Sequence, residues 1–453
     1  MLLAVQLPDV TDDEFASSLG ELGRLAKTLG LDVVARVTQR RSRLATSAVV
    51  GEGKLAELAR WTGGTGVVPT GPPIPRRRAD RESAQEDEPE TAAEPQAAAE
   101  GAGEAIPPEQ RASVVLIDHD VTPSQARNLE RATGAEVLDR TAVILAIFQR
   151  HARSREARLQ VEIARLNYMA PRLRETGGGK DRQGGGIGGR GAGESSIELA
   201  RRKRRDRVAE LRSELASIER DSSTRRKRRE QQNTVALVGY TNAGKSSWMR
   251  ALTGSGVLVQ DKLFATLDTT VRALQPETVP RILVSDTVGF IKKLPHDLVA
   301  SFRSTLDEAR DADLLLHLVD AADPAFPAQI EVTLDVLREI GASDATRLLV
   351  LNKIDRVDAP ARAQLAAAWP DAIQVSAKDP ADVERMRERI RAFFERDTIE
   401  TELLVPYARQ RVVGEAHSVC RVLEERHDEH GTRLRLRARP EVIERLRHAS
   451  EGR

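Results

Sequence analysis

The chain has 453 residues, of which 40% are hydrophobic and 31% are charged, and its formal net charge is +1. That length predicts about three domains, and the single cysteine, Cys420, excludes a disulfide within the chain and favours a reducing compartment. Residues 1–14 turn acidic too early for a secretory signal, and no apolar run approaches the roughly 20 residues of a membrane helix. We therefore expect a cytoplasmic protein without a membrane span, and peripheral contact with a membrane stays open.

Residues 1–149 are predicted to form an N-terminal α/β domain. Apolar runs at 2–5 and 31–37 indicate strands, and the apolar residues between them recur at the three- and four-residue steps of a helix. These helical positions are Phe15, Leu19, Leu22, Leu25 and Leu29. The segment 51–54 resembles a second phosphate loop, but it is too short and lacks the hydroxyl residue, so we interpret it as the turn that begins a helix.

Residues 63–112 differ in composition from their surroundings. Gly, Pro, Ala and Glu dominate this stretch, and large apolar residues are almost missing. Such a segment cannot bury enough surface to offset its ordering entropy, so we predict a disordered insertion. An apolar strand at 114–118 follows, and Thr122 with Pro123 predicts the start of a helix. The insertion therefore interrupts one domain.

Residues 150–232 are helical in pattern and basic. One apolar stripe contains Leu159, Ile163, Leu166 and Met169, and a second contains Val208, Leu211, Leu215 and Ile218. A glycine-rich tip at 177–193 separates them, which predicts an antiparallel helical hairpin. Basic clusters at 201–205 and 225–229 favour salt-sensitive contact with RNA phosphates over a merely solvated face. The candidate RNA contacts are Lys180, Arg182, Arg190, Arg201, Arg202, Lys203, Arg204 and Arg205.

Residues 233–397 alternate apolar strands with helical patterns. The strands are expected at 234–238, 281–285, 314–319, 348–351 and 372–375. This alternation predicts a parallel sheet with helices on both faces, which binds ligands at the carboxyl ends of its strands. His317 falls inside a strand, and we interpret it as a core histidine.

The first of these strands runs into a phosphate-binding pattern, G-x-x-x-x-G-K-[ST]. It comprises Gly239, Tyr240, Thr241, Asn242, Ala243, Gly244, Lys245 and Ser246, with Ser247 after them. Backbone N–H groups of such a loop and the N-terminus of the following helix attract phosphate. Lys245 is predicted to reach the β- and γ-phosphates, and Ser246 to bind Mg²⁺.

Two further motifs follow later strands. In Asp286, Thr287, Val288 and Gly289, the aspartate is expected to hold Mg²⁺ through water, and the Gly289 N–H to sense the γ-phosphate. In Asn352, Lys353, Ile354 and Asp355, the carboxylate can accept hydrogen bonds from N1–H and the 2-amino group of guanine, which adenine lacks. Bonds of roughly 1.5–3 kcal/mol each would favour GTP over ATP. Ser376, Ala377 and Lys378 are expected to close over the base.

Catalysis also needs a hydroxyl between the phosphate loop and Asp286. The segment Phe264, Ala265, Thr266, Leu267 and Asp268 lies there, and spacing alone leaves Thr266, Thr269 and Thr270 as alternatives. Many GTPases orient the attacking water with a glutamine directly after the glycine of this motif, but Phe290 occupies that position. We therefore expect slow intrinsic hydrolysis that a partner accelerates.

Residues 398–453 are predicted to form a small C-terminal α/β domain. Strands are expected at 399–405 and 434–437. Arg433, Arg435, Arg437 and Arg439 would line one strand face. Their pattern fits a second RNA contact and a solvated face equally well.

Several motifs together resemble the HflX family of ribosome-associated GTPases, within the Obg–HflX superfamily. They are residues 123–130, 138–140, 159–162, 239–246, 263–268, 286–291 and 294–298. The resemblance implies Thr266 as the Mg²⁺-binding threonine, so that Ser246 and Thr266 bind the metal directly, and Lys245, Thr266 and Gly289 serve catalysis. It also implies the large ribosomal subunit and its rRNA as partners and the splitting or rescue of stalled or inactive ribosomes. We expect a free monomer; the alternative is a GTP-gated regulatory module that binds a protein.

Overall fold

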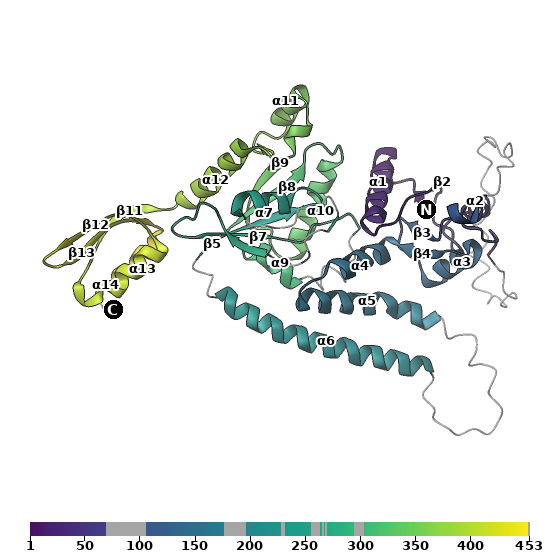
Figure 1. Ribbon diagram of the computed structural model, residues 1–453, viewed down its shortest axis with the longest axis horizontal. Coiled ribbons are helices and arrows are strands. Elements are labelled where there is room, and N and C mark those ends of the chain that lie inside the picture. Colours follow the sequence, from purple (N-terminus) through teal and green to yellow (C-terminus); the bar gives the residue numbers. More distant parts are fainter. Residues whose placement is uncertain are drawn as a thin grey trace, which may run out of the picture. The chain divides into compact units, whose positions relative to one another are not determined.

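The computed structural model describes residues 1–68, 106–175, 196–227, 232–254, 263–264, 267, 270–293 and 303–451. The chain divides into two compact units, Met1–Ile144 and Leu145–Arg453, and Figure 1 labels most of their helices and strands. Each unit contains strands and helices, and the second holds a mainly parallel sheet, which confirms the expected multidomain α/β fold. Within the ranges described, no helix is long and apolar enough to cross a membrane.

The first unit is built on a parallel sheet with the strand order β2-β1-β3-β4. Its strands are β1 (Leu2–Gln6), β2 (Arg36–Arg40), β3 (Val114–Ile117) and β4 (Glu136–Asp139). Its helices are α1 (Asp12–Thr28), α2 (Glu52–Thr62), η2 (Pro108–Gln110) and α3 (Pro123–Thr133), and α4 (Arg140–His151) leads into the second unit. Helix α3 begins at Pro123 with a capping box on Thr122, as the sequence predicts.

Two predictions for this unit need correction. The expected strand at 31–37 is wrong, because β2 begins only at Arg36 and the side chains of Val33 and Val34 are 37% and 46% exposed. The expected disordered insertion lies mainly at 69–105, outside the described residues. Its described flanks are ordered, however: Ala112 belongs to the core and Val68 packs against it. The prediction of disorder is therefore wrong for residues 63–68 and 106–112, and for residues 69–105 it stays a prediction.

Two helices of the second unit form the predicted antiparallel hairpin, α5 (Arg155–Glu175) and α6 (Ser196–Lys227). Leu159 and Ile163 of α5 pack against Val208 and Leu211 of α6. Ion pairs cross the same interface, at 2.6 Å from Arg155 to Glu214 and 3.1 Å from Arg207 to Glu162. Met169 was expected in the apolar stripe, but its side chain is exposed.

The second unit contains a six-stranded sheet with the order β10-β9-β8-β5-β7-β6. Its strands are β5 (Asn233–Gly239), β6 (Thr270–Ala273), β7 (Ile282–Asp286), β8 (Leu314–Asp320), β9 (Thr346–Asn352) and β10 (Ile373–Gln374). Its helices are α7 (Lys245–Thr253), α9 (Arg303–Arg310), α10 (Phe326–Glu339), η3 (Ile354–Arg356), α11 (Ala359–Ala368) and α12 (Pro380–Glu395). All pairs are parallel except β6 with β7, an antiparallel edge that the sequence did not predict.

Helices cover both faces of this sheet because every central strand is apolar on both sides. Val235 and Leu237 of β5 pack toward α7 and α12, whereas Ala236 and Val238 pack toward α9 and α10. His317 of β8 is fully buried, as expected of a core histidine. Burial is the largest of the causes that lower its pKa to about 3, so this imidazole is neutral at physiological pH.

The C-terminal residues form an antiparallel sheet with the order β11-β13-β12. Its elements are β11 (Ile399–Val405), η4 (Tyr407–Arg409), α13 (Arg411–Val419), β12 (Arg421–Asp428), β13 (Gly431–Ala438) and α14 (Pro440–Glu451). Both helices pack on one face of the sheet. On β13, Arg433 pairs with Asp428, and Arg435 and Arg437 pair with Glu400. Arg439 lies beyond the end of β13. Because the other three guanidinium groups already pair with acids, two of them with the same Glu400, a solvated face is favoured over a second RNA contact.

Candidate functional site

The phosphate loop connects β5 directly to α7, in the strand–loop–helix order that its mechanism needs. Gly244 precedes the helix with a φ of 98°, which favours glycine, and a β-carbon there would lie only 2.2 Å from Asn352 Nδ2. The loop therefore turns tightly against the end of β9. Lys245 and Ser246 open helix α7, so that their backbone N–H groups belong to its N-terminus.

The ammonium group of Lys245 is enclosed by the loop. It donates hydrogen bonds of 3.0 Å to the Gly239 carbonyl and 2.8 Å to the Tyr240 carbonyl. Burial lowers the pKa of Lys245 to about 8, and the nearby Asp286 carboxylate only partly opposes that effect. The side chain is thus held against the backbone of the phosphate loop.

Asp286 ends β7 and lies in register with Leu237 of β5, so the sheet itself brings it beside the loop. The Ser246 hydroxyl donates a 2.8 Å hydrogen bond to Asp286 Oδ2. A hydroxyl and a buried carboxylate that meet in this way are oxygen donors of the kind Mg²⁺ prefers. Of the alternative threonines, Thr270 begins β6 opposite Asp286. Thr266, Thr269, Ala265 and Asp268 lie outside the described residues.

The segment after Asp286 is tied to the phosphate loop. Thr287 donates its hydroxyl hydrogen to the Leu237 carbonyl at 2.7 Å, and Val288 is buried. Phe290 pairs with Tyr240 as a parallel bridge, because its N–H donates to the Gly239 carbonyl and its carbonyl accepts from the Thr241 N–H. The Phe290 ring is only 1% exposed, in the core under β5. A side chain held there cannot reach water at the nucleotide.

Two of the predicted switch residues are described, Phe264 and Leu267, and both are buried. The Phe264 ring packs edge-on against Phe148 of α4, with ring centroids 4.6 Å apart. Sequence reasoning had not connected Phe148 with this segment, since nothing in the spacing links two positions so far apart.

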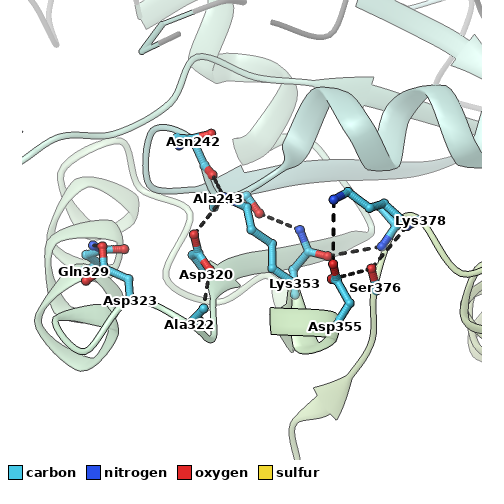
Figure 2. A network of polar contacts seen from close by, with 12 residues as sticks. Asn242, Ala243, Asp320, Ala322, Asp323, Gln329, Lys353, Asp355, Ser376 and Lys378 are labelled. Carbon is cyan, nitrogen blue, oxygen red and sulfur yellow. Dashed lines mark hydrogen bonds and ion pairs between the residues drawn. The ribbon is translucent and has the colours of Figure 1, made fainter. Parts of the chain in front are cut away.

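The predicted base-recognition residues converge at the ends of β9 and β10 (Figure 2). The Ser376 hydroxyl donates a 2.7 Å hydrogen bond to Asp355 Oδ1, and the Lys378 ammonium lies 3.7 Å from Asp355 Oδ2. The hydrogen bond from Ser376 is the main cause that lowers the pKa of Asp355. The carboxylate therefore stays ionised at neutral pH and can accept hydrogen bonds from a base.

Asn352 is buried and its amide orientation is set by three neighbours. Its Nδ2 donates to the Ala243 carbonyl at 2.7 Å, and its Oδ1 accepts from the Trp248 indole at 2.9 Å and the Ala377 N–H at 3.4 Å. These bonds join the phosphate loop, α7 and the segment after β10. Trp248 helps to position Asn352. The sequence did not predict this role, because a tryptophan near the start of a helix is usually interpreted as a core residue.

Lys353 has a positive φ of 59° and links the same segments. Its ammonium donates 2.7 Å hydrogen bonds to the Asn242 carbonyl and to Asp320 Oδ2 at the end of β8 (Figure 2). Ile354 beside it is buried. Asp320 was also missed, although a carboxylate that ends an apolar strand is a signal that could have identified it.

The candidate RNA contacts form a separate group. Arg201, Arg202, Lys203, Arg204 and Arg205 all lie on α6, and Arg202, Lys203 and Arg205 are exposed. Lys180, Arg182 and Arg190 at the expected tip fall outside the described residues.

This fold and this site define a P-loop GTPase. Family models match three parts of the chain, and they are described as GTP-binding GTPase N-terminal (residues 16–68 and 97–149), GTP-binding GTPase Middle Region (151–229) and 50S ribosome-binding GTPase (234–353). The match to the last covers β5 to β9, where the phosphate loop and the Asp286 segment lie.

Two curated relatives identify the family within this class. The GTPase HflX of Gluconacetobacter diazotrophicus is 57% identical over 100% of this chain and 98% of its own length. The GTPase HflX of Caldanaerobacter subterraneus subsp. tengcongensis is 36% identical over 98% of this chain and 93% of its own length. A solved GTP-binding protein from Sulfolobus solfataricus, in complex with GDP, is 23% identical with a TM-score of 0.40 over 86% of this chain and 98% of that one. The chain belongs to the GTPase HflX family and is a GTPase.

Proposed function

We propose that this GTPase binds the large ribosomal subunit through its rRNA and uses GTP binding and hydrolysis to split or rescue stalled or inactive ribosomes. The observation that carries the proposal is the exposed basic group on α6, at Arg202, Lys203 and Arg205. The description of the family model over 234–353, a 50S ribosome-binding GTPase, supports the choice of subunit.

The hairpin is built to present these cations to a polyanion. Its apolar stripe and the pairs Arg155–Glu214 and Arg207–Glu162 join α5 to α6. The basic residues at 202, 203 and 205 are exposed instead of packed in that interface. Lysine and arginine on a rigid helix bind phosphates without reading sequence, and such binding weakens as salt rises. The expected ligand is therefore the RNA backbone.

In the nucleotide site, Mg²⁺ would be held by Ser246 and Thr266 directly and by Asp286 through water. The ion would neutralise charge on the β- and γ-phosphates. Lys245 would contact the same phosphates, the Gly289 N–H would sense the γ-phosphate, and Asp355 would accept from the guanine edge. The Ser246–Asp286 hydrogen bond at 2.8 Å supports this assignment, because it brings a hydroxyl oxygen and a carboxylate oxygen together beside the loop.

The proposal includes a slow intrinsic reaction that the ribosome accelerates. Phe290 supports it, because a buried hydrocarbon ring occupies the position of the usual water-orienting glutamine. We further propose that the free protein is a cytoplasmic monomer that meets its partner by diffusion.

The direct test is GTP hydrolysis with and without purified large subunits, together with cosedimentation in a non-hydrolysable GTP analogue. Hydrolysis should rise with subunits, and binding should weaken steeply with salt. A variant with Arg201, Arg202, Lys203, Arg204 and Arg205 changed to glutamine should lose about tenfold or more in affinity. The matched control changes Arg433, Arg435 and Arg437 of β13 and should bind normally.

Unchanged binding by the α6 variant would refute the assignment of these residues. If no ribosomal subunit stimulated hydrolysis, the result would favour the alternative function, a GTP-gated module that acts on a protein partner.

A further inference from the structure

The position of Phe290 raises the question of which group orients the attacking water. Its ring is buried, and its backbone is fixed to the phosphate loop by bonds of 3.1 Å from its N–H to the Gly239 carbonyl and 2.7 Å from the Thr241 N–H to its carbonyl. Turning the ring out would open the core, and the ring carries no polar atom that could hold a water. A different polar group must therefore approach the reacting phosphate.

Thr241 carries such a group. The residue is only 6% exposed, and its Oγ1 makes no hydrogen bond within the part of the chain that the structure describes. A buried hydroxyl without a partner is costly, so each instance calls for an explanation. By contrast, the hydroxyl of Thr287 is also buried but donates a hydrogen bond of 2.7 Å to the Leu237 carbonyl.

Thr241 lies beside two residues that are expected to contact phosphate, Gly289 and Lys245. A β-carbon built on Gly289 would be 2.9 Å from Thr241 Cα, 3.0 Å from Thr241 Cγ2 and 2.9 Å from Lys245 Nζ. Gly289 and Lys245 are the residues expected to contact the γ-phosphate. The Cα and methyl group of Thr241 thus border the same small space, and its hydroxyl is one bond from that methyl-bearing carbon.

We propose that Thr241 is a catalytic residue whose hydroxyl donates a hydrogen bond to a γ-phosphate oxygen and accepts one from the attacking water. The water oxygen forms the new bond to the γ-phosphorus, and the bond from that phosphorus to the β–γ bridging oxygen breaks. The electron pair stays on GDP, and the water proton passes to an oxygen of the departing phosphate. Thr241 keeps its own proton, so its role is to place the water and bridge it to the phosphate.

The test compares Thr241→Val, which removes the hydroxyl and keeps the shape, with Thr241→Ser, which keeps the hydroxyl. Single-turnover hydrolysis of saturating GTP by the full chain should fall about 10²-fold in the valine variant. The serine variant should recover most of that rate. GDP affinity should change by less than about threefold in both, because GDP lacks the γ-phosphate.

Two further measurements separate catalysis from folding. Binding of GDP with aluminium fluoride, a mimic of the transferring phosphoryl group, should weaken in Thr241→Val and in a second variant, Thr241→Ala. The control Thr333→Val removes another fully buried hydroxyl, on α10, and should leave hydrolysis unchanged. A full rate in Thr241→Val, or equal losses in valine and serine variants, would overturn the proposal. So would a loss of GDP affinity as large as the loss of rate.

Discussion

At the scale of single residues, the buried Lys245 makes the stability of the protein depend on pH. Burial lowers its pKa to about 8 in the free site, whereas an unfolded lysine titrates near about 10.4. Between these values the unfolded chain binds more protons, so the free energy of unfolding contributed by this residue rises with pH there. Below about pH 8 the cost of burying the charge is present in full.

We predict that GDP binding takes up protons at alkaline pH. Phosphate oxygens beside Lys245 favour its charged form and raise its pKa again, so more than about half a proton should be taken up near pH 8.5. Calorimetric titrations in two buffers of different ionisation enthalpy measure that uptake. It should grow between pH 7.5 and pH 8.5; identical heats in both buffers at both pH values would show that the pKa is not lowered.

Residue identities were predictable from the sequence where a motif has fixed spacing. The loop from Gly239 to Ser246 and the residues Asp286 and Asp355 could all be named in advance. Trp248 and Asp320 were missed, because each acts by orienting a motif residue from a separate element, although the position of Asp320 at the end of an apolar strand was a usable signal. Their hydrogen bonds to Asn352 and Lys353 depend on three-dimensional proximity that spacing does not encode.

At the scale of elements, the hairpin depends on a small apolar interface. Leu211 is fully buried between α5 and α6, and it packs with Leu159, Ile163 and Val208. We predict that Leu211→Ala destabilises the packed hairpin by about 2–4 kcal/mol through lost burial and a cavity. Hydrogen exchange of the α5 and α6 amides should report that loss as faster exchange.

The matched control lies on the same helix. Leu199 of α6 is 42% exposed, so Leu199→Ala should change amide exchange little. GDP affinity should be normal in both variants, since neither residue touches the nucleotide site. Equal protection in Leu211→Ala and the unchanged protein would mean that this interface does not hold the helices together.

Helices and strands were predicted well where the apolar pattern was clear or a capping residue marked the start of the element. Helix α3 follows Thr122 and Pro123, and the apolar strands β5, β8 and β11 fall close to their expected ranges. Edge strand β6 was missed because Thr270–Ala273 is short and half exposed, so it carries little apolar signal. The strand predicted at 31–37 was wrong for the opposite reason: Val33 and Val34 give an apolar signal but remain at the surface.

At the scale of the whole molecule, sheet topology explains why distant motifs meet. Parallel strands β5, β7 and β9 end at the same edge of one sheet, and each is followed by one motif. The alternation of strands and helices was enough to predict this convergence. The register that sets Asp286 beside Leu237, and the pairing of Phe290 with Tyr240, could be found only in the structure.

The central claim is that this sheet edge selects guanine nucleotides, and calorimetry of the full chain with GDP and ADP tests it most directly. Two hydrogen bonds to Asp355 that adenine cannot make predict a preference for GDP of about 100-fold or more. Asp355→Asn should weaken GDP and improve binding of xanthosine diphosphate, whose 2-oxo group accepts from the new amide. Equal affinity of the unchanged protein for GDP and ADP would contradict the account.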